Sequence, residues 1–480
     1  MSLLAPESSL WRRFRNPPSC ALTESLFLRL LGLIYIAAFA SLWPQVIGLV
    51  GKQGIAPAGQ VMAAMREQVG SKIFFYVPSL FWLGIGDSAL LWFCAIGCIA
   101  AAALVIGFWP RTAAAVCFLL YLSLVAVAQP FLGFQWDALL LESGFLALFA
   151  GLPSLVWAYR FLLFRLMFES GAVKLLSHDE SWRNLHAMRF HFMTQPLPNP
   201  AAYYAYRLPG RMLDSMTAAT LAIELICPFF LFGPALLRRI GIALLILLQI
   251  LIVITGNYAF FNLLALALCL WALDDRTFAP LARFLRMHPP SIRWAPLRNA
   301  LTVLLAILVT IGALQVLDMF LPGARPVRNA LRWIAPFEII NSYGLFAVMT
   351  TTRSEIVIEG SDDQVHWREY SFKYKPGELH RGLPLVAPYQ PRLDWQMWFA
   401  ALGTYQENNW VGGLMYRLLT GEPHVLGLLN PPPFVKPPHY LRALIYDYQF
   451  TTPAERSRTG AVWQRKLLGA WFGPVSLNGQ

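Results

Sequence analysis

Long runs of apolar residues, separated by short polar connections, dominate the first 321 positions of the chain. A transmembrane helix needs about 20 predominantly apolar residues to cross roughly 30 Å of hydrocarbon. Runs near this length recur about nine times, the fifth and eighth being the shortest. They lie at about 22–50, 86–108, 112–132, 138–158, 160–176, 216–237, 239–256, 258–273 and 299–321. The pattern predicts a polytopic α-helical membrane protein with about nine spans.

A polar segment at 177–211 interrupts this pattern between the fifth and sixth runs. Trp182, Leu185, Met188 and Phe192 recur in it at helical spacing, which predicts a short amphipathic helix lying in the membrane interface. The Pro-Leu-Pro-Asn-Pro run at 196–200 would end this helix. A simple loop outside the membrane is the alternative.

The C-terminal region has the composition of a soluble domain with β character. Residues 355–360 and 366–374 alternate polar and apolar positions around a Ser-Asp-Asp turn, and 440–450 alternates again, so three strands are expected. Residues 392–402 and 409–419 have a helical period. We therefore expect a helical bundle over 1–321, with an outer interface loop at 177–211, followed by an extramembrane α+β lobe over 322–480 that contains a small β-sheet or sandwich.

Composition and charge agree with a membrane location. Hydrophobic residues make up 57% of the chain and charged residues 13%, whereas soluble domains have about 45–50% and about 25%. Short cytoplasmic connections collect Lys and Arg, and the arginines fall in alternate connections. They are Arg12, Arg13, Arg15, Arg111, Arg160, Arg165, Arg238, Arg239, Arg276, Arg283, Arg286, Arg293 and Arg298. This places the N-terminus in the cytoplasm and the C-terminal lobe outside it, so the net charge of +12 reflects topology and no nucleic acid partner is expected.

Cysteine usage and processing signals bear on the compartment. All six cysteines precede the C-terminal region, so no disulfide is expected there. No Asn-x-Ser/Thr sequon occurs, and the last residues are not a retention signal. These absences favour a bacterial inner membrane, with the endoplasmic reticulum membrane as the location in a eukaryote.

Ionisable residues inside the apolar runs are candidates for function, because each is costly in a membrane unless it is paired or hydrated. Arg165 and Glu169 are four apart and can pair on one helix. Lys174 lies five residues after Glu169 and points about 140° away from it, so it needs a partner from another helix. We expect these residues to line an intramembrane polar site, whose members are Asp137, Glu142, Arg165, Glu169, Lys174 and Glu224.

Structural roles are the alternatives at these positions. Glu142 and Glu169 could hydrogen-bond to the backbone of a neighbouring helix where Gly144 and Gly171 allow close approach, and Lys174 could extend to the membrane surface. His178, His186 and His191 are spaced by eight and five residues, which puts no two on one helical face. No metal or cofactor is therefore expected.

Several longer motifs resemble the lipase maturation factor family. They are FQWDALLLESGFLALF at 134–149, RLMFESGAVKLLSHDESW at 165–182, HFMTQPLPNPAAYYAYRLP at 191–209, and the long stretch from Asn341 to Gly377. The resemblance implies a membrane-embedded, chaperone-like maturation factor that helps secreted proteins, lipases first among them, to fold and assemble. Its partners would be the lipid bilayer and an exported client that meets the C-terminal lobe.

Polar and aromatic residues around the predicted hairpin are candidates for contact with such a client. The alternatives are core packing for the aromatic side chains and a surface ion pair for Arg353 and Glu359. The candidates are Tyr343, Arg353, Glu359, Trp367 and Lys375.

A second resemblance covers the membrane half alone. Gly171-Ala-Val-Lys-Leu175, followed by Trp182, is similar to the segment of vitamin K-dependent carboxylases that holds their catalytic lysine, and the two families look like variants of one helical scaffold. It implies Lys174 as a catalytic base, with Leu175 as the other possible counterpart. The alternative function is therefore a membrane enzyme acting on a quinone-like or lipid substrate, while the first expectation is a protein that is not an enzyme.

Overall fold

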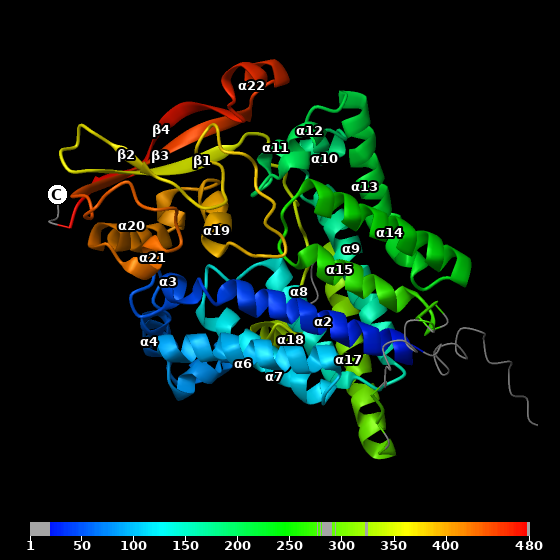
Figure 1. Cartoon of the computed structure of the whole chain (residues 1–480). Helices are drawn as coiled ribbons and strands as arrows, with labels where there is room; N and C mark the ends of the chain where they lie inside the picture. Colours follow the sequence, from blue (N-terminus) through cyan, green and yellow to red (C-terminus); the bar gives the residue numbers. More distant parts are fainter. Residues whose placement is uncertain are drawn as a thin grey trace, which may run out of the picture.

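The computed structural model describes residues 20–477, apart from 276, 279, 281–289, 293 and 322–324. Within these residues, six helices are long and apolar enough to cross a membrane. They are α2 (Ala21–Leu42), α6 (Asp87–Ile106), α7 (Pro110–Val127), α13 (Gly210–Phe230), α14 (Ala235–Thr255) and α17 (Ala295–Phe320). Apolar side chains such as Leu247, Ile254 and Val303 are exposed on these helices, as expected for surfaces that face lipid. The molecule is a polytopic membrane protein (Figure 1).

The other three predicted segments form helices that are shorter or more polar. These are α8 (Gln135–Leu146) with η3 (Ala147–Phe149), α9 (Leu155–Leu176), and α15 (Phe261–Cys269) with η4 (Leu270–Ala272). The 12 residues of α8 extend about 18 Å, which is less than the roughly 30 Å of a hydrocarbon core. Helix α9 has 22 residues, and four of them are Arg160, Arg165, Glu169 and Lys174. The expected nine spans thus remain a prediction for these three segments.

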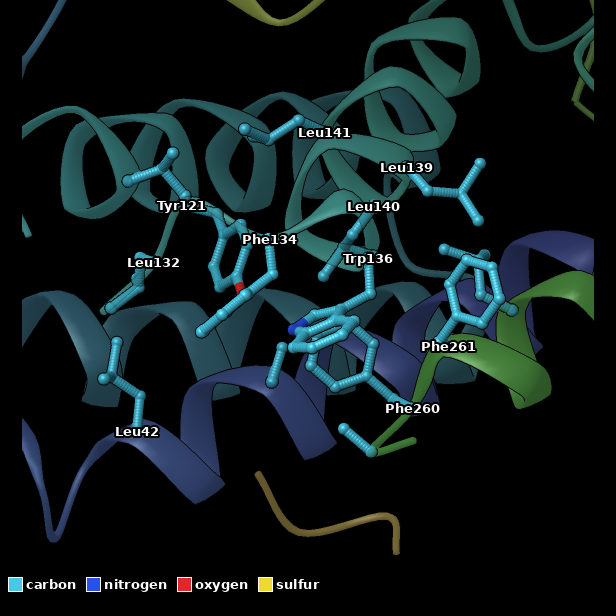
Figure 2. Close-up of a cluster of buried hydrophobic side chains, with 14 of the residues drawn as sticks. Leu42, Tyr121, Leu132, Phe134, Trp136, Leu139, Leu140, Leu141, Phe260 and Phe261 are labelled. Atoms are coloured by element: carbon cyan, nitrogen blue, oxygen red, sulfur yellow. The ribbon is translucent and has the colours of Figure 1, made fainter. Parts of the chain in front are cut away.

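Large buried side chains hold the bundle together. Figure 2 shows Tyr121, Phe134, Trp136 and Phe260 gathered with leucines from α2 and α8. Small residues let the helices approach one another: a Cβ added at Gly32 of α2 would lie 2.7 Å from the carbonyl oxygen of Ala101 in α6. The close contacts between helices therefore depend on glycine where backbones meet.

Short helices occupy the connections between the long ones. They are α3 (Val46–Val50), α4 (Ala58–Val69), η1 (Gly70–Lys72), α5 (Ile73–Tyr76), η2 (Leu80–Leu83), α10 (Glu180–Arg183), α11 (Met188–Thr194), α12 (Pro200–Ala205), α18 (Arg325–Ile334) and η5 (Ala335–Phe337).

The prediction of one continuous interface helix around Trp182 is wrong. The chain breaks between α10 and α11, where Leu185 has a φ of 61°. Trp182 and Phe192 are buried against α13 and its neighbours rather than in lipid. The Trp182 indole donates a hydrogen bond to the carbonyl of Phe346 at 2.9 Å. The aromatic side chains that were predicted to lie in the membrane interface therefore pack against other parts of the protein.

The C-terminal lobe is built on a four-stranded antiparallel sheet with the order β2-β1-β3-β4. Its strands are β1 (Ser354–Ser361), β2 (Arg368–Tyr370), β3 (Tyr440–Phe450) and β4 (Trp463–Val475). Its helices are α19 (Arg392–Ala400), η6 (Tyr405–Glu407), α20 (Trp410–Thr420), α21 (Pro423–Leu426) and α22 (Pro453–Thr459). Figure 1 shows α19, α20 and α21 between the sheet and the bundle. The predicted strands and both predicted helices occur, although the second strand is only three residues long, and β4 was not predicted.

Candidate functional site

The intramembrane ionisable residues form three separate sets of contacts. In the first, Asp137 at the start of α8 receives both Nη groups of Arg392 from the lobe, at 2.6 and 2.8 Å. The hydroxyl of Tyr121 donates to the same carboxylate at 2.5 Å. All three side chains are buried. This set joins the bundle to the lobe.

The second set centres on Glu142. Arg165 forms its ion pair with this carboxylate on α8, so the predicted partner, Glu169, is wrong. Glu142 also accepts hydrogen bonds from the hydroxyl of Tyr343 at 2.8 Å and the backbone N–H of Asn341 at 3.0 Å. Glu169 accepts the backbone N–H of Tyr343 at 2.7 Å. The backbone groups that donate to these carboxylates therefore come from the segment that leads from the bundle to the lobe, rather than from a neighbouring helix.

The third set holds Lys174, whose Nζ lies 2.7 Å from Glu224 of α13 and donates to the carbonyl of Ser170 at 3.1 Å. The partner from another helix that the sequence required is therefore Glu224. A Cβ at Gly171 would lie 2.9 Å from the Cβ of Glu224, so this glycine lets α9 and α13 approach closely. The ammonium also lies 5.1 Å from the ring centre of Trp182, a favourable cation–π geometry.

Lys174 and Glu224 line a pocket, called here the Lys174 pocket, around which about 660 Å³ between protein atoms is unfilled, open solvent included. Its polar lining also includes His191 and a hydrogen-bonded pair in which Asn262 donates to Gln249 at 2.7 Å. Burial, together with the charge of Lys174, lowers the pKa of His191 to about 4. The imidazole is therefore uncharged at neutral pH. The apolar lining includes Leu166, Met167, Trp182, Met188, Leu248, Ile252, Phe261, Leu345 and Phe346.

An aromatic groove adjoins this pocket where the bundle meets the lobe, with about 940 Å³ of space unfilled by protein atoms, open solvent included. Tyr258, Leu345 and Phe346 line both cavities. Three of the apolar residues that line the groove are exposed: Val348 by 65%, Phe399 by 39% and Leu402 by 48%. The groove residues used below are Phe134, Trp136, Tyr258, Phe346, Val348, Trp395, Trp398, Phe399 and Leu402.

Most of the predicted client-contact residues are buried. Arg353 and Lys375 both pair with Glu355, at 2.7 and 2.8 Å. Arg353 also donates to the carbonyls of Met193, Gln195 and Pro196, which ties the lobe to the 177–211 segment.

The remaining client-contact candidates are also engaged within the chain. Glu359 pairs with Arg442 at 2.7 Å, not with Arg353. Arg442 also lies over the ring of the half-buried Trp367. Buried Tyr343 belongs to the Glu142 set. The surface ion pair considered for Arg353 and Glu359 is thus wrong, and only Trp367 of the five is partly exposed.

Several important residues escaped sequence reasoning. Arg392 is fully buried, yet it lies in a region of soluble composition, so nothing marked it as a partner of Asp137. Gln249 and Asn262 are polar residues inside apolar runs, a signal that a search restricted to ionisable groups passed over. His191 was considered only as a metal ligand. Within the described ranges, no three His, Cys, Asp or Glu side chains gather in an arrangement that could hold a metal ion.

The architecture defines a class: a polytopic membrane protein whose bundle is joined by a buried ion pair and by buried hydrogen bonds to a C-terminal lobe with a β-sheet. The chain belongs to the lipase maturation factor family. Residues 22–280 match the lipase maturation factor transmembrane domain, and residues 339–473 match the lipase maturation factor C-terminal domain.

Relatives match along nearly the whole chain. Lipase maturation factor 1 of Bos taurus is 33% identical over 95% of this chain and 89% of its own length. Lipase maturation factor 2 is 34% identical in Gallus gallus and 32% in Homo sapiens, over 95% of this chain and 81% and 83% of their lengths. No solved structure matches this chain.

Proposed function

We propose that this protein is a membrane-embedded maturation factor that assists the folding and assembly of secreted lipases. The observation that carries the proposal is the family match across both the bundle and the lobe, in proteins named lipase maturation factors. The buried contacts between bundle and lobe are consistent with one functional unit that works at the membrane surface.

The carboxylase-like alternative has no comparable support. A general base must offer a lone pair near the proton that it removes. Lys174 is instead a hydrogen-bond donor in an ion pair at 2.7 Å from Glu224. Its nitrogen is thus already engaged with the Glu224 carboxylate and the carbonyl of Ser170.

We propose a division into a membrane bundle over 1–321 and an exported lobe over 322–480, with about nine passes through the membrane region. Its support is that successive connections make contacts on alternate sides. Arg417, Arg392 and Arg353 of the lobe donate to the carbonyls of Gly54, Phe131 and Met193. Those acceptors lie in the connections after α2, α7 and α9.

The intervening connections are linked to one another on the other side. Arg111 donates to Ala150, Arg160 to Trp271, and Arg238 pairs with Asp274. This basic side is the cytoplasmic one by the positive-inside rule. The lobe would then lie in the periplasm of a bacterium or in the lumen of the endoplasmic reticulum. Arg165 does not count toward the rule because it is buried beside Glu142. Arg12, Arg13, Arg15, Arg276, Arg283, Arg286 and Arg293 lie outside the described residues.

We propose the aromatic groove as the place where an apolar segment of the client binds. Exposed apolar side chains grouped in one place are typical of protein-binding surfaces, and Val348, Phe399 and Leu402 provide them. The buried client-contact candidates named from the sequence would then support the lobe from within. Trp367 remains a candidate outside the groove.

The test is co-expression of the chain with an exported lipase in cells that lack members of this family. We expect the activity per mass of exported lipase to rise with the wild-type chain and to fall again with Leu402→Asp. Val435→Asp is the matched control, because Val435 is fully exposed in the lobe and does not line the groove. Unchanged lipase activity with the wild-type chain would reject the function. Equal activity of the two variants would reject the groove as the client site.

A further inference from the structure

The Lys174 pocket combines buried polar groups with a hydrocarbon lining. Lys174 and Glu224 line the pocket and form an ion pair at 2.7 Å. Leu166, Met167 and Leu248 supply apolar surface elsewhere in the lining. Pockets that bind small molecules have this character, with few polar groups set in an apolar lining.

The polar groups of the pocket sum to no net charge. Lys174 and Glu224 neutralise each other, the pKa of His191 is lowered to about 4, and Gln249 and Asn262 are uncharged amides. A ligand with a charged head would leave that charge uncompensated in a medium of low dielectric constant, which is unfavourable. The pocket therefore selects against ionised ligands.

One acceptor in the pocket is left without a donor. Glu224 is 93% buried and uses Oε2 for Lys174, while its Oε1 accepts no hydrogen bond from any residue that the structure describes. Among the described residues, Oε1 is not one of the fully enclosed atoms that lack a partner, so a donor on a molecule in the pocket can reach it. A hydroxyl group on the ligand would supply that donor, whereas a head with carbonyl groups alone would not.

The pocket is connected to the place where membrane and lobe meet. Tyr258, Leu345 and Phe346 line both the pocket and the aromatic groove. Ile252 of the pocket is half-buried, and its neighbours Leu251 and Val253 on α14, a helix apolar enough to cross a membrane, are exposed. An amphiphile from the bilayer therefore has apolar surface beside the pocket.

We propose that the Lys174 pocket binds an uncharged lipid whose head carries a hydroxyl group, of the diacylglycerol type. The hydroxyl donates to Glu224, and the acyl chain lies against Leu166, Leu248 and Ile252. Nothing in the role as a maturation factor requires such a ligand, so this site can exist whether or not the client is a lipase.

The test uses the full chain in detergent micelles and three lipid probes with a diazirine in one acyl chain: a diacylglycerol, the matched phosphatidic acid and the matched triacylglycerol. Crosslinked peptides are identified by mass spectrometry. We expect the diacylglycerol to label peptides that line the pocket. Labelling by the charged probe and by the probe that lacks a hydroxyl should be weaker by roughly tenfold.

The variant Leu248→Trp fills the pocket, and Leu247→Trp is its control, because Leu247 is the neighbouring residue on α14 and is 48% exposed. We expect Leu248→Trp to lower labelling by roughly tenfold, and Leu247→Trp to leave it unchanged, at equal amounts of monodisperse protein. If Leu248→Trp does not fold, Ile252→Trp against Leu251→Trp replaces the pair. Equal labelling of the filled and control variants, or equal labelling by phosphatidic acid or triacylglycerol, would overturn the proposal. Lipase secretion does not enter this readout.

Discussion

Arg392 and Asp137 connect two parts of the chain that are 255 residues apart. Both side chains are buried, and each satisfies the other at 2.6 and 2.8 Å. Arg392→Leu leaves the Asp137 carboxylate without its cation, which costs about 3–5 kcal/mol. We expect a large loss of folding stability, measured as a lower midpoint of thermal unfolding in detergent.

The double variant Arg392→Leu/Asp137→Leu removes both charges and should recover most of that loss, because no unpaired charge stays buried. Arg189→Leu is the control, since its pair with Asp214 is partly exposed, with side chains 41% and 26% accessible, and should contribute far less. Equal effects of Arg392→Leu and Arg189→Leu would show that the buried pair does not join the bundle to the lobe.

Lys174 and Glu224 allow a second prediction. Lys174→Met leaves the buried Glu224 carboxylate without its cation and should destabilise the bundle by about 3–5 kcal/mol. We expect less folded protein in the membrane, with lipase maturation falling in parallel. The measurement is exported lipase activity divided by the amount of folded chain, quantified by fluorescence-detected size exclusion.

The double variant Lys174→Met/Glu224→Leu distinguishes a structural role of this ion pair from a role in the maturation mechanism. If the pair only braces α9 against α13, the double variant regains folded protein, and lipase activity per folded molecule equals that of wild type. A double variant that folds but has no maturation activity would instead place the pair in the working mechanism.

At the residue scale, the sequence predicted the buried charged positions well, because a charge inside a membrane has a high free-energy cost. The expense of charge in a membrane marked Asp137, Glu142, Glu169, Lys174 and Glu224, and the structure describes all five as buried with a partner. The partners were harder to predict, because Arg392 and Tyr343 lie far away in the chain. Pairing across such separations is set by tertiary packing, which local spacing does not encode.

At the scale of elements, strong periodicity was reliable and irregular strands were not. Strand β3 was expected at 440–450 and forms over Tyr440–Phe450. Strand β4 was missed because its sequence, WQRKLLGAWFGPV, contains glycine and proline and does not alternate. Register shifts between β3 and β4 accommodate this irregular pattern. The strand therefore depends on its partner more than on its own propensity.

This dependence can be tested by removing β4. Trp463 at its start is buried and stacks on Phe450 of β3 with ring centres 4.2 Å apart. A chain that ends after Gly460 would expose one edge of β3 and lose this contact. We expect rapid trypsin cleavage within 354–450, while a chain that ends after Val475 stays as resistant as the full chain. Equal resistance of both would mean that the lobe is stable without β4.

On the scale of the whole molecule, the bundle and lobe are joined through the Asp137 pair, the Glu142 set and the contacts of Arg353 with the 177–211 segment. The family was apparent from motifs in both parts of the sequence. The aromatic groove and the Lys174 pocket were not, because each is lined by residues from several distant segments. A cavity is the space left after packing, so its shape follows only from the complete fold.

The proposed topology makes the last prediction. If the chain passes through the membrane region an odd number of times, its two ends lie on opposite sides. Alkaline phosphatase, which is active only after export, should be active when fused after Gln480. It should be inactive when inserted after Gly233, in the basic-side connection between α13 and α14. Green fluorescent protein at the same two positions should give the reverse result and control for expression. Activity of alkaline phosphatase at Gly233 with none at Gln480 would invert the membrane orientation, remove the lobe from the exported side and exclude contact between the aromatic groove and a secreted client.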